Sequence, residues 1–347
     1  MSGQVEPQFV RAPEEFYKRG SPLIATEPVP ACPVCGGREQ SEFSAGFDYE
    51  LLTCVNCWHF VKCSDCGHVW LNPRPAVTEL STIYPPSYYS YNYAGINPVA
   101  RKAKAFLDRR KMGRIIAACQ RRPQTYLDVG CGDGRFLKVL ETFGVQRSGL
   151  YGLELDGRVV ERLHGEGYPE VFCERVEDAQ GIPEGGIDLA TMFHVIEHVD
   201  DPATVVRRIR DWLSPEGIFA LETPNLDSVD ARLFQRTYWG GYHIPRHWNL
   251  FTPRTIARLL TDNGMEVISV GFQTGHSFWM YSLHHLVRYE KGSRPRLGKV
   301  FDPMKSLWGI AAFTGIDLLR GLLGAKTSAM LVIARKTAAA KQAWNQR

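Results

Sequence analysis

TYLDVGCGDGRF, residues 125–136, joins a short apolar strand to a glycine-rich turn that opens a helix. Glycines at 130, 132 and 134 let the backbone pass close to a ligand, and the free amide groups at the helix start favour anionic or polar groups. The next strand carries Glu154, twenty residues beyond Gly134, where an acid typically takes ribose hydroxyls. The bulky Arg135 disfavours the G-x-G-x-x-G turn of nicotinamide-binding proteins. We therefore expect an adenosine-containing cofactor here, with a ligand-free tight turn as the alternative.

Strands and helices alternate on both sides of this turn. Strands are predicted at TYLDV, GLYGLEL, VFC, IDLATMFHV, GIFALETP and MEVISVGFQ, and a last one at SAMLVIARK. Amphipathic helices fall between them, with Asp156, Pro202 and Thr252 suited to begin three of these helices. The alternation predicts an α/β fold, a doubly wound and mostly parallel Rossmann-like sheet with helices on both faces.

The turn from Asp128 to Gly134, with Glu154 after it, resembles the S-adenosylmethionine (SAM) site of class I methyltransferases. The resemblance covers roughly Thr125 to Lys336 and implies a seven-stranded methyltransferase sheet. It implies that Asp128 and the glycines hold the methionine end of SAM and that Glu154 binds its ribose. An acid after the third strand usually faces the adenine, and Glu177 and Asp178 stand there. The implied cofactor-binding residues are Asp128, Gly130, Cys131, Gly132, Gly134, Glu154, Leu155, Val176, Glu177 and His194, of which Leu155 and Val176 are candidates to sandwich the adenine.

Two further motifs supply candidate bases. The segment FHVIEHV, residues 193–199, ends the fourth strand and is similar to a segment that lies beside the methyl donor in many small-molecule class I methyltransferases. YWGGYHIPRHWNLF, residues 238–251, follows the fifth strand, and its Pro-Arg-His resembles a loop that closes the active site in that family. His194, His198, His243 and His247 are therefore candidate catalytic residues, because an imidazole titrates near neutral pH. The alternatives are a structural Glu197–His198 pair and a loop whose aromatic side chains plug a lid while Arg246 pairs with a carboxylate.

Six of the nine cysteines lie between Cys32 and Cys66. Cys32, Cys35, Cys63 and Cys66 form two C-x-x-C-G knuckles, the pattern of a structural Zn²⁺ site with four thiolates. Cys54 and Cys57 make a third pair, which competes on spacing because 18 residues separate Cys35 from Cys54 and 27 separate it from Cys63. We prefer Cys63 and Cys66, which Gly67 follows; Cys54 and Cys57 are spare or bind a second metal with His59 or His68. The second knuckle also resembles the zinc ribbons that precede some bacterial methyltransferases.

These motifs divide the 347 residues into segments. We expect an N-terminal tail or loose wrap (1–30), a zinc ribbon (31–72), a Tyr/Pro-rich connector and basic helix (73–122), a SAM-binding core (123–275), a helical substrate-side insertion (276–326), the last core strand (327–337) and a tail (338–347). No secretory signal is visible and the longest apolar stretch is too short to span a bilayer, so we expect a cytoplasmic protein.

The net charge of +4 is unevenly distributed, because residues 101–122 hold nine Lys or Arg and one Asp. This basic helix could bind RNA, acidic lipid headgroups or an anionic substrate. We favour a structural role, in which the charged face is solvated and the helix packs through its apolar stripe of Val99, Ala103, Phe106 and Leu107. The apolar segment from Leu307 to Leu323 could form a substrate channel, lie on a membrane, or pack against the sheet or another subunit. Five tyrosines, at 84, 88, 89, 91 and 93, drape over the pocket or pack between domains.

The sequence thus predicts a SAM-dependent methyltransferase with a structural zinc site. Its acceptor would be a small or lipid-like molecule, attacked through O, N or C, with alignment and desolvation as the main catalytic contributions. One alternative is an RNA methyltransferase that grips RNA with the ribbon and the basic helix. Another is a noncatalytic scaffold that docks a protein partner. The acceptor, the oligomeric state and any peripheral membrane contact stay open at this point.

Overall fold

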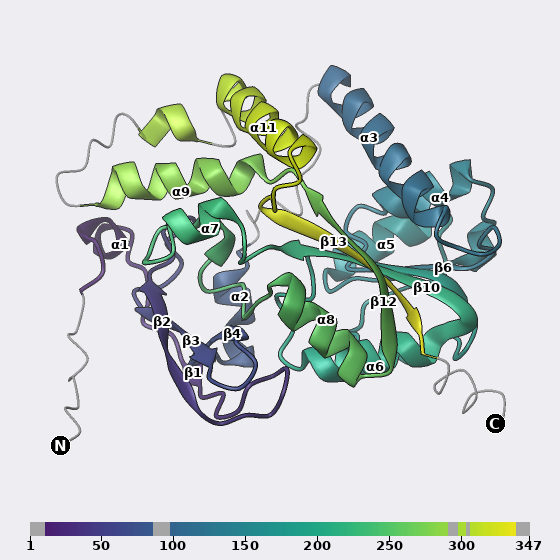
Figure 1. Ribbon diagram of the computed structural model, residues 1–347, viewed down its shortest axis with the longest axis horizontal. Coiled ribbons are helices and arrows are strands. Elements are labelled where there is room, and N and C mark those ends of the chain that lie inside the picture. Colours follow the sequence, from purple (N-terminus) through teal and green to yellow (C-terminus); the bar gives the residue numbers. More distant parts are fainter. Residues whose placement is uncertain (1–10, 86–97, 291–297, 303–305, 338–347) are drawn as a thin grey trace.

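The central feature of the structure is a seven-stranded sheet in the order β12-β13-β10-β9-β6-β7-β8 (Figure 1). This computed structural model describes residues 11–85, 98–290, 298–302 and 306–337. The strands are β6 (Tyr126–Val129), β7 (Leu150–Leu153), β8 (Val171–Phe172), β9 (Ile187–Phe193), β10 (Leu213–Pro224), β12 (Met265–Gln273) and β13 (Ala329–Lys336). Neighbouring strands from β8 to β10 pair in parallel, whereas β13 lies antiparallel between β10 and β12. The predicted Rossmann-like methyltransferase sheet is confirmed.

Helices cover both faces of this sheet and bury its central strands. The helices between the core strands are α4 (Arg135–Thr142), α5 (Gly157–Gly165), α6 (Pro202–Trp212), α7 (Val229–Leu233) and α8 (Pro253–Asp262), with short 3₁₀ turns at η4 (Arg147–Gly149) and η5 (Gly240–Tyr242). Asp156 accepts the Arg158 amide at the start of α5, Pro202 occupies the first turn of α6, and Thr252 caps α8, all as predicted. Apolar residues of α6 and α8 join one core cluster, and those of α4 and α5 join the cluster on the other face.

The cysteine-rich segment forms a second sheet, in the order β11-β4-β3-β2, whose edge strand β11 comes from a later part of the chain. Its strands are β2 (Gln40–Gly46), β3 (Trp58–Cys63), β4 (Val69–Leu71) and β11 (Asn249–Leu250). The first three belong to the ribbon, but β11 comes from the loop after β10, and Asn249 pairs with Trp70. The ribbon is therefore joined to the methyltransferase core by backbone hydrogen bonds.

Residues 11–30, before the ribbon, contain regular structure where a tail or loose wrap was predicted; the rest of that segment, residues 1–10, lies outside the described residues. Residues 11–30 form α1 (Glu14–Lys18) and β1 (Thr26–Glu27), and β1 pairs with β5 (Arg74–Pro75). The side chain of Phe16 is fully buried against Phe47 of the ribbon. The two aromatic residues lie about thirty positions apart and belong to no periodic pattern, so the sequence alone did not predict their contact.

The basic helix packs through a different face from the predicted one. It is α3 (Pro98–Ile116), which follows η1 (Val77–Glu79) and α2 (Leu80–Ile83). Phe106 and Leu107 are exposed, so the predicted packing face is wrong there; Val99 and Ala103 lie in the turn whose side chains the structure does not describe. Met112 and Ile115 are buried in the core instead.

Polar contacts explain that orientation: Asp108 pairs with Arg135, and Lys111 pairs with Glu222 at the end of β10.

Residues between β12 and β13 form the expected helical insertion. It contains α9 (His276–Tyr289), η6 (Lys299–Phe301) and α11 (Leu307–Leu322), and α9 packs against η5 of the core. No helix among the described residues is both long and apolar enough to cross a membrane.

Candidate active site

The glycine-rich turn after β6 has the backbone shape that only glycine adopts readily. Gly130, Gly132 and Gly134 all have positive φ angles, of 74°, 52° and 72°. A Cβ at Gly134 would lie 2.5 Å from Leu163 of α5, whereas a Cβ at Gly132 would meet no atom within 4 Å. At Gly134 the turn is therefore packed against α5, whereas at Gly132 the space beside the backbone is open and leaves room for a ligand.

Two carboxylates flank this opening. Asp128 is buried; its Oδ1 accepts from the Thr191 hydroxyl at 2.9 Å, and its Oδ2 has no partner. Burial raises the pKa of Asp128 to about 7. Glu154 accepts the backbone amides of Gly132, Leu155 and Asp156, which fixes its carboxylate at the end of β7. A cofactor with an ammonium group and ribose hydroxyls fits these groups, since it offers donors to both acids.

The other residues predicted to bind the cofactor lie around the same edge of the sheet. Leu155 follows Glu154 and is 63% exposed. Val176 is buried in the core cluster, and Glu177 is half-buried and paired with Arg175. The Cys131 thiol points toward Gly152 in the sheet, so Cys131 offers a ligand its backbone only.

The turn from His194 to His198 packs directly on the glycine turn. A Cβ at Gly130 would lie 2.5 Å from the Val195 side chain. His194 has a φ of 57°, and its ring nitrogens contact Glu197 Oε1 at 3.3 Å and Glu222 Oε1 at 3.2 Å. The surrounding protein disfavours a charged imidazole, but the two carboxylates outweigh this effect and raise the pKa of His194 to about 9. His194 is therefore protonated at neutral pH, with a side chain that is 44% exposed.

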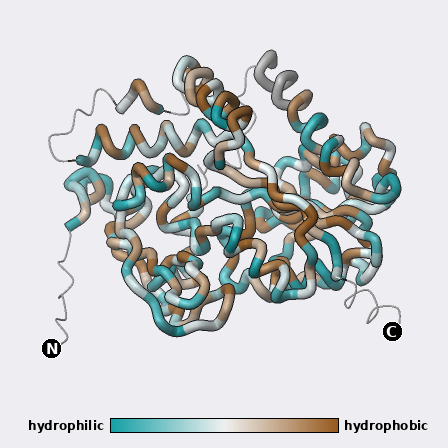
Figure 2. Tube along the Cα trace, in the orientation of Figure 1, coloured by the Kyte–Doolittle hydropathy of each residue, from teal (hydrophilic) through white to brown (hydrophobic). Residues whose placement is uncertain are grey.

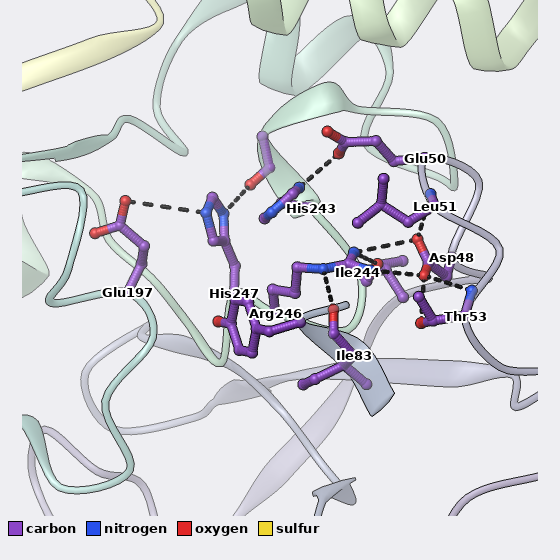
Figure 3. A network of polar contacts seen from close by, with 12 residues as sticks. Asp48, Glu50, Leu51, Thr53, Ile83, Glu197, His243, Ile244, Arg246 and His247 are labelled. Atoms are coloured by element: carbon purple, nitrogen blue, oxygen red, sulfur yellow. Dashed lines mark hydrogen bonds and ion pairs between the residues drawn. The ribbon is translucent and has the colours of Figure 1, made fainter. Parts of the chain in front are cut away.

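His198, His243 and His247 form a cluster of three imidazoles, which we call the histidine cluster. Figure 3 shows two of its members, His243 and His247. Ring centroids lie 4.6 Å apart for His198 and His247 and 4.9 Å apart for His243 and His247. Burial lowers the pKa of His198 to about 4 and that of His247 well below its usual value, so both rings are neutral. His198 Nδ1 contacts the Arg246 carbonyl and the Tyr84 hydroxyl, each at 2.9 Å. Tyr84 thus lies at the site; Tyr88, Tyr89, Tyr91 and Tyr93 fall outside the described residues.

Glu197, which the sequence paired with His198 as a structural alternative, has other hydrogen-bond partners. Glu197 is fully buried and accepts from His194 and from the Thr223 hydroxyl, rather than forming the structural pair with His198. Glu197, His198 and His247 each present a ligand atom within 4.8 Å of the others, so they could hold a divalent cation.

The ribbon contributes two acids to this site, and the sequence did not single out either one. Glu50 Oε2 lies 2.5 Å from His243 Nδ1, and both side chains are buried. Asp48 receives both terminal nitrogens of Arg246, at 3.2 and 2.8 Å, and this ion pair is fully buried (Figure 3). Arg246 therefore pairs with a carboxylate, as the structural alternative for the loop required. An acidic pair in an aromatic stretch, Asp48-Tyr49-Glu50, was the available signal, but its partners lie almost 200 residues away.

A small cavity separates the ribbon from the loop. It measures about 10 Å³, and Glu50, His243 and His285 line it together with aromatic side chains, among them Tyr49 and Trp239. Glu50 Oε1 and His285 Nε2 are buried without a hydrogen-bond partner. Unpaired buried polar atoms are costly, so this cavity suits a hydrogen-bonding group such as water or a hydroxyl.

The four knuckle cysteines come together in the ribbon. Cys32, Cys35, Cys63 and Cys66 present their sulfur atoms within 4.8 Å of one another, and the Cys32–Cys66 and Cys35–Cys63 sulfur pairs are each 3.6 Å apart. Four such sulfurs fit a tetrahedral metal ion. Cys54 and Cys57 pack in two other apolar clusters, and His68 binds Asn249, so the described residues do not assemble a second site from this pair.

Comparison with known proteins agrees with this arrangement. A family model described as "Methyltransferase domain" matches residues 100–270. The chain is 28% identical over 169 residues to the ubiquinone biosynthesis O-methyltransferase of Neisseria meningitidis serogroup C (strain 053442), covering 45% of this chain and 69% of that protein. The protein of the same name from Xanthomonas euvesicatoria pv. vesicatoria (strain 85-10) is 29% identical over 156 residues, covering 42% of this chain and 63% of that protein.

Among solved structures, the PH0226 protein from Pyrococcus horikoshii OT3 is similar with a TM-score of 0.46 and 12% identity, covering 73% of this chain and 98% of that one. The matched region spans about two thirds of the length of the curated relatives. The family match covers residues 100–270, just under half of the chain, and together with the seven-stranded sheet and the glycine turn that follows β6 it supports a class I SAM-dependent methyltransferase.

Proposed function

We propose that this methyltransferase transfers a methyl group to a hydroxyl group of a small or lipid-like acceptor. The observation that carries the proposal is the buried contact between Glu50 of the ribbon and His243 of the loop, beside the turn that packs on the glycine turn. A hydroxyl holds its proton tightly at neutral pH, so its attack on a methyl donor needs a base. The names of the matched relatives, ubiquinone biosynthesis O-methyltransferases, support an oxygen acceptor.

The cofactor residues proposed are those at the open edge of the sheet. Asp128 would accept from the ammonium group of SAM, the backbone at Gly130, Cys131, Gly132 and Gly134 would pass beside it, and Glu154 would accept from the ribose hydroxyls. Leu155, Val176 and Glu177 would surround the adenine, and His194 would lie at the methyl end. When bound, SAM supplies a methyl group activated by its positively charged sulfur.

We assign the base role to His243. His194 is protonated at neutral pH, and the depressed pKa values of His198 and His247 make them weak bases. Glu50 orients the His243 ring through Nδ1 and stabilises the positive charge that the ring gains with the acceptor proton, as the carboxylate does in a catalytic triad. His243 also has a φ of 38°, and such strained backbone is concentrated at functional sites.

The ribbon is proposed to bind one structural Zn²⁺ through Cys32, Cys35, Cys63 and Cys66. Four thiolates leave no coordination position open for catalysis, so the ion would stabilise the ribbon. The ribbon in turn supplies Glu50 and Asp48. Zinc would therefore act on catalysis only by holding these two acids in place.

The test of this function uses SAM labelled in its methyl group with a panel of phenols and lipid-linked hydroxyl compounds. We expect His243→Asn to lower kcat about 10²–10⁴-fold, the usual contribution of a general base, with the affinity for SAM unchanged by calorimetry. Glu50→Gln should lower kcat by a smaller factor than His243→Asn, because the base is still present but has lost the carboxylate that orients it. Full activity of His243→Asn would exclude the base role, and absence of SAM binding by the wild-type protein would exclude the enzyme function itself.

A further inference from the structure

Helix α11 exposes its apolar side to solvent. Leu307, Leu322 and Leu323, at its two ends, are 80%, 86% and 77% exposed. The exposed residues between them are also apolar: Trp308, Ala311, Ala312, Gly315, Ile316, Leu318, Leu319 and Gly321. Figure 2 shows α11 as a largely hydrophobic helix on the edge of the molecule.

The two charged residues of α11 point toward the protein instead. Asp317 is 1% exposed and accepts from the Gly275 amide at 2.8 Å and from Trp279 Nε1 at 3.2 Å. Arg320 bonds to Asp317 at 2.9 Å and to the Lys326 carbonyl. The usual amphipathic arrangement, with apolar residues inside and charges outside, is therefore inverted. Such a continuous apolar face marks an interaction site, since scattered exposed leucines alone need no explanation.

A second apolar patch lies on α3, which rises along the same edge of the molecule in Figure 1. Phe106 and Leu107 are 65% and 61% exposed, and Arg110 and Arg114 are exposed farther along the helix. As on α11, the inward-facing groups of this helix include charged ones, Asp108 and Lys111, which are paired with the core.

The charge of the chain selects the kind of partner. Residues 291–326, which contain α11, hold seven Lys or Arg and two Asp, a net charge of +5. Residues 101–122, which contain most of α3, carry +8, and the whole chain carries only +4, so all other residues together carry −9. The segments with exposed apolar helix faces are thus the positively charged segments of an otherwise acidic chain. Arg110 and Arg114 expose positive charge on the helix that carries Phe106 and Leu107, so two copies of this surface repel each other, whereas an anionic lipid surface attracts it.

We propose that α11 and the exposed side of α3 dock on the surface of an anionic phospholipid bilayer. At 1.5 Å per residue, the 16 residues of α11 extend about 24 Å, so the helix suits a position in the plane of the interface. Leu318, Leu319 and Leu322 enter the acyl boundary, and the exposed arginines of α3 contact headgroup phosphates. Trp308 occupies the interfacial region that tryptophan favours.

Docking of α11 on a membrane would hold α9 in place, and α9 contacts the loop that carries His243. The Trp279 ring of α9 stacks on Phe313 of α11, with centroids 5.9 Å apart. Ser282 of α9 accepts the Gly240 amide at 2.8 Å, at the start of η5 in the loop that carries His243. The membrane-facing helix and the candidate active site are therefore separated by one helix.

The experiment is co-sedimentation of the full chain with vesicles of phosphatidylcholine alone and of phosphatidylcholine mixed equally with phosphatidylglycerol. We expect binding to the mixed vesicles, weaker binding at high salt and little binding to phosphatidylcholine alone. The double variant Leu318→Glu/Leu322→Glu should reduce binding at least tenfold, and Arg110→Glu/Arg114→Glu should reduce it for the anionic vesicles. Leu23→Glu, at a leucine that is 76% exposed near the ribbon, is the matched control and should bind as the wild type does.

Circular dichroism and SAM affinity establish that each variant is folded, and neither measurement depends on lipid binding. Equal binding to both kinds of vesicle, no binding to either, or unchanged binding of the Leu318→Glu/Leu322→Glu variant would each overturn the proposal. Light scattering of the lipid-free protein tests the alternative that a second copy of the chain binds this face. A dimer that dissociates in the leucine variant, without vesicle binding, would assign the face to a second copy of the chain instead.

Discussion

The glycine turn and the contact between ribbon and loop are built in opposite ways. The turn assembles within seven residues, Asp128 to Gly134, and receives Glu154 from the next strand. The ribbon contact joins Asp48 and Glu50 to Arg246 and His243 across more than 190 residues. In the proposed function the turn would position the cofactor by backbone geometry, whereas the ribbon contact would position a base by buried charge.

The difference shows that the ribbon packs directly against the candidate active site. If the ribbon were a separate module, its loss would leave the core site unchanged. Instead β4 pairs with β11 in one sheet, and the pair of Glu50 with His243 crosses the same boundary. Damage to the ribbon and damage to the glycine turn should therefore both abolish methyl transfer, but by separable routes.

The largest effect is expected from loss of the zinc site. Cys63→Ser should remove the bound metal and lower the melting temperature by about 10 °C or more, because metal binding contributes ~10–16 kcal/mol in small zinc modules. The measurements are zinc content by atomic emission and thermal unfolding by circular dichroism. Cys57→Ser, outside the cluster, is the control and should keep its zinc. A zinc-free Cys63→Ser protein with wild-type activity would make the ribbon a separate module after all.

Breaking the buried ion pair should come next. Asp48→Asn leaves the Arg246 guanidinium buried without its counter-charge, which costs about 3–5 kcal/mol of unfolding free energy. Urea denaturation measures this loss, and Glu266→Gln, at a half-exposed pair with Arg335, should cost less than about 1 kcal/mol. Adding Arg246→Met to Asp48→Asn should recover part of the stability. A loss as small as that of the surface variant would mean that water reaches the pair.

The sequence predicted the regions whose determinants are local. The alternation of strands and helices, the helix caps at Asp156 and Thr252, and the meeting of four cysteines follow from spacing and residue type over a few positions. The sequence did not predict the role of Asp48 or Glu50, since an acid in a loop has no local sign of its distant partner. It also assigned Phe106 and Leu107 to the wrong side of α3, where the pairs of Asp108 and Lys111 with the core outweigh apolar burial.

Damage on the cofactor side should be specific to SAM. Gly132→Val places a branched side chain at a φ of 52°, in the space beside the turn, and should weaken SAM binding about 100-fold. Calorimetry with SAM measures the affinity, and the zinc content should stay at the wild-type level. Tight SAM binding by this variant would contradict the proposed position of the cofactor.

A smaller effect is expected in the pH dependence of the unfolding free energy. Burial lowers the pKa of His285, behind the ribbon contact, from 6.5 to about 3. The unfolded chain then binds one more proton than the folded chain between these values, so stability falls as pH decreases through this range, by up to about 1.4 kcal/mol per pH unit. Urea denaturation at pH 6 and pH 4.5 should show a shallower dependence of stability on pH for His285→Gln than for the wild type. Identical slopes for wild type and His285→Gln would mean that His285 is protonated in the folded state.

The smallest effect should come from a local interaction that the sequence did predict. Asp156→Ala removes the side chain that accepts the Arg158 amide at 3.0 Å and should cost about 1 kcal/mol. Glu161→Ala, on the exposed side of the same helix, should change stability by less than about 0.5 kcal/mol. Comparing Asp156→Ala with Asp48→Asn measures the contrast directly, since one acid contacts its near neighbours and the other a residue almost 200 positions away. If Asp156→Ala cost as much unfolding free energy as Asp48→Asn, the local helix cap and the long-range ion pair would contribute equally to stability, and the contrast between the two regions would fail.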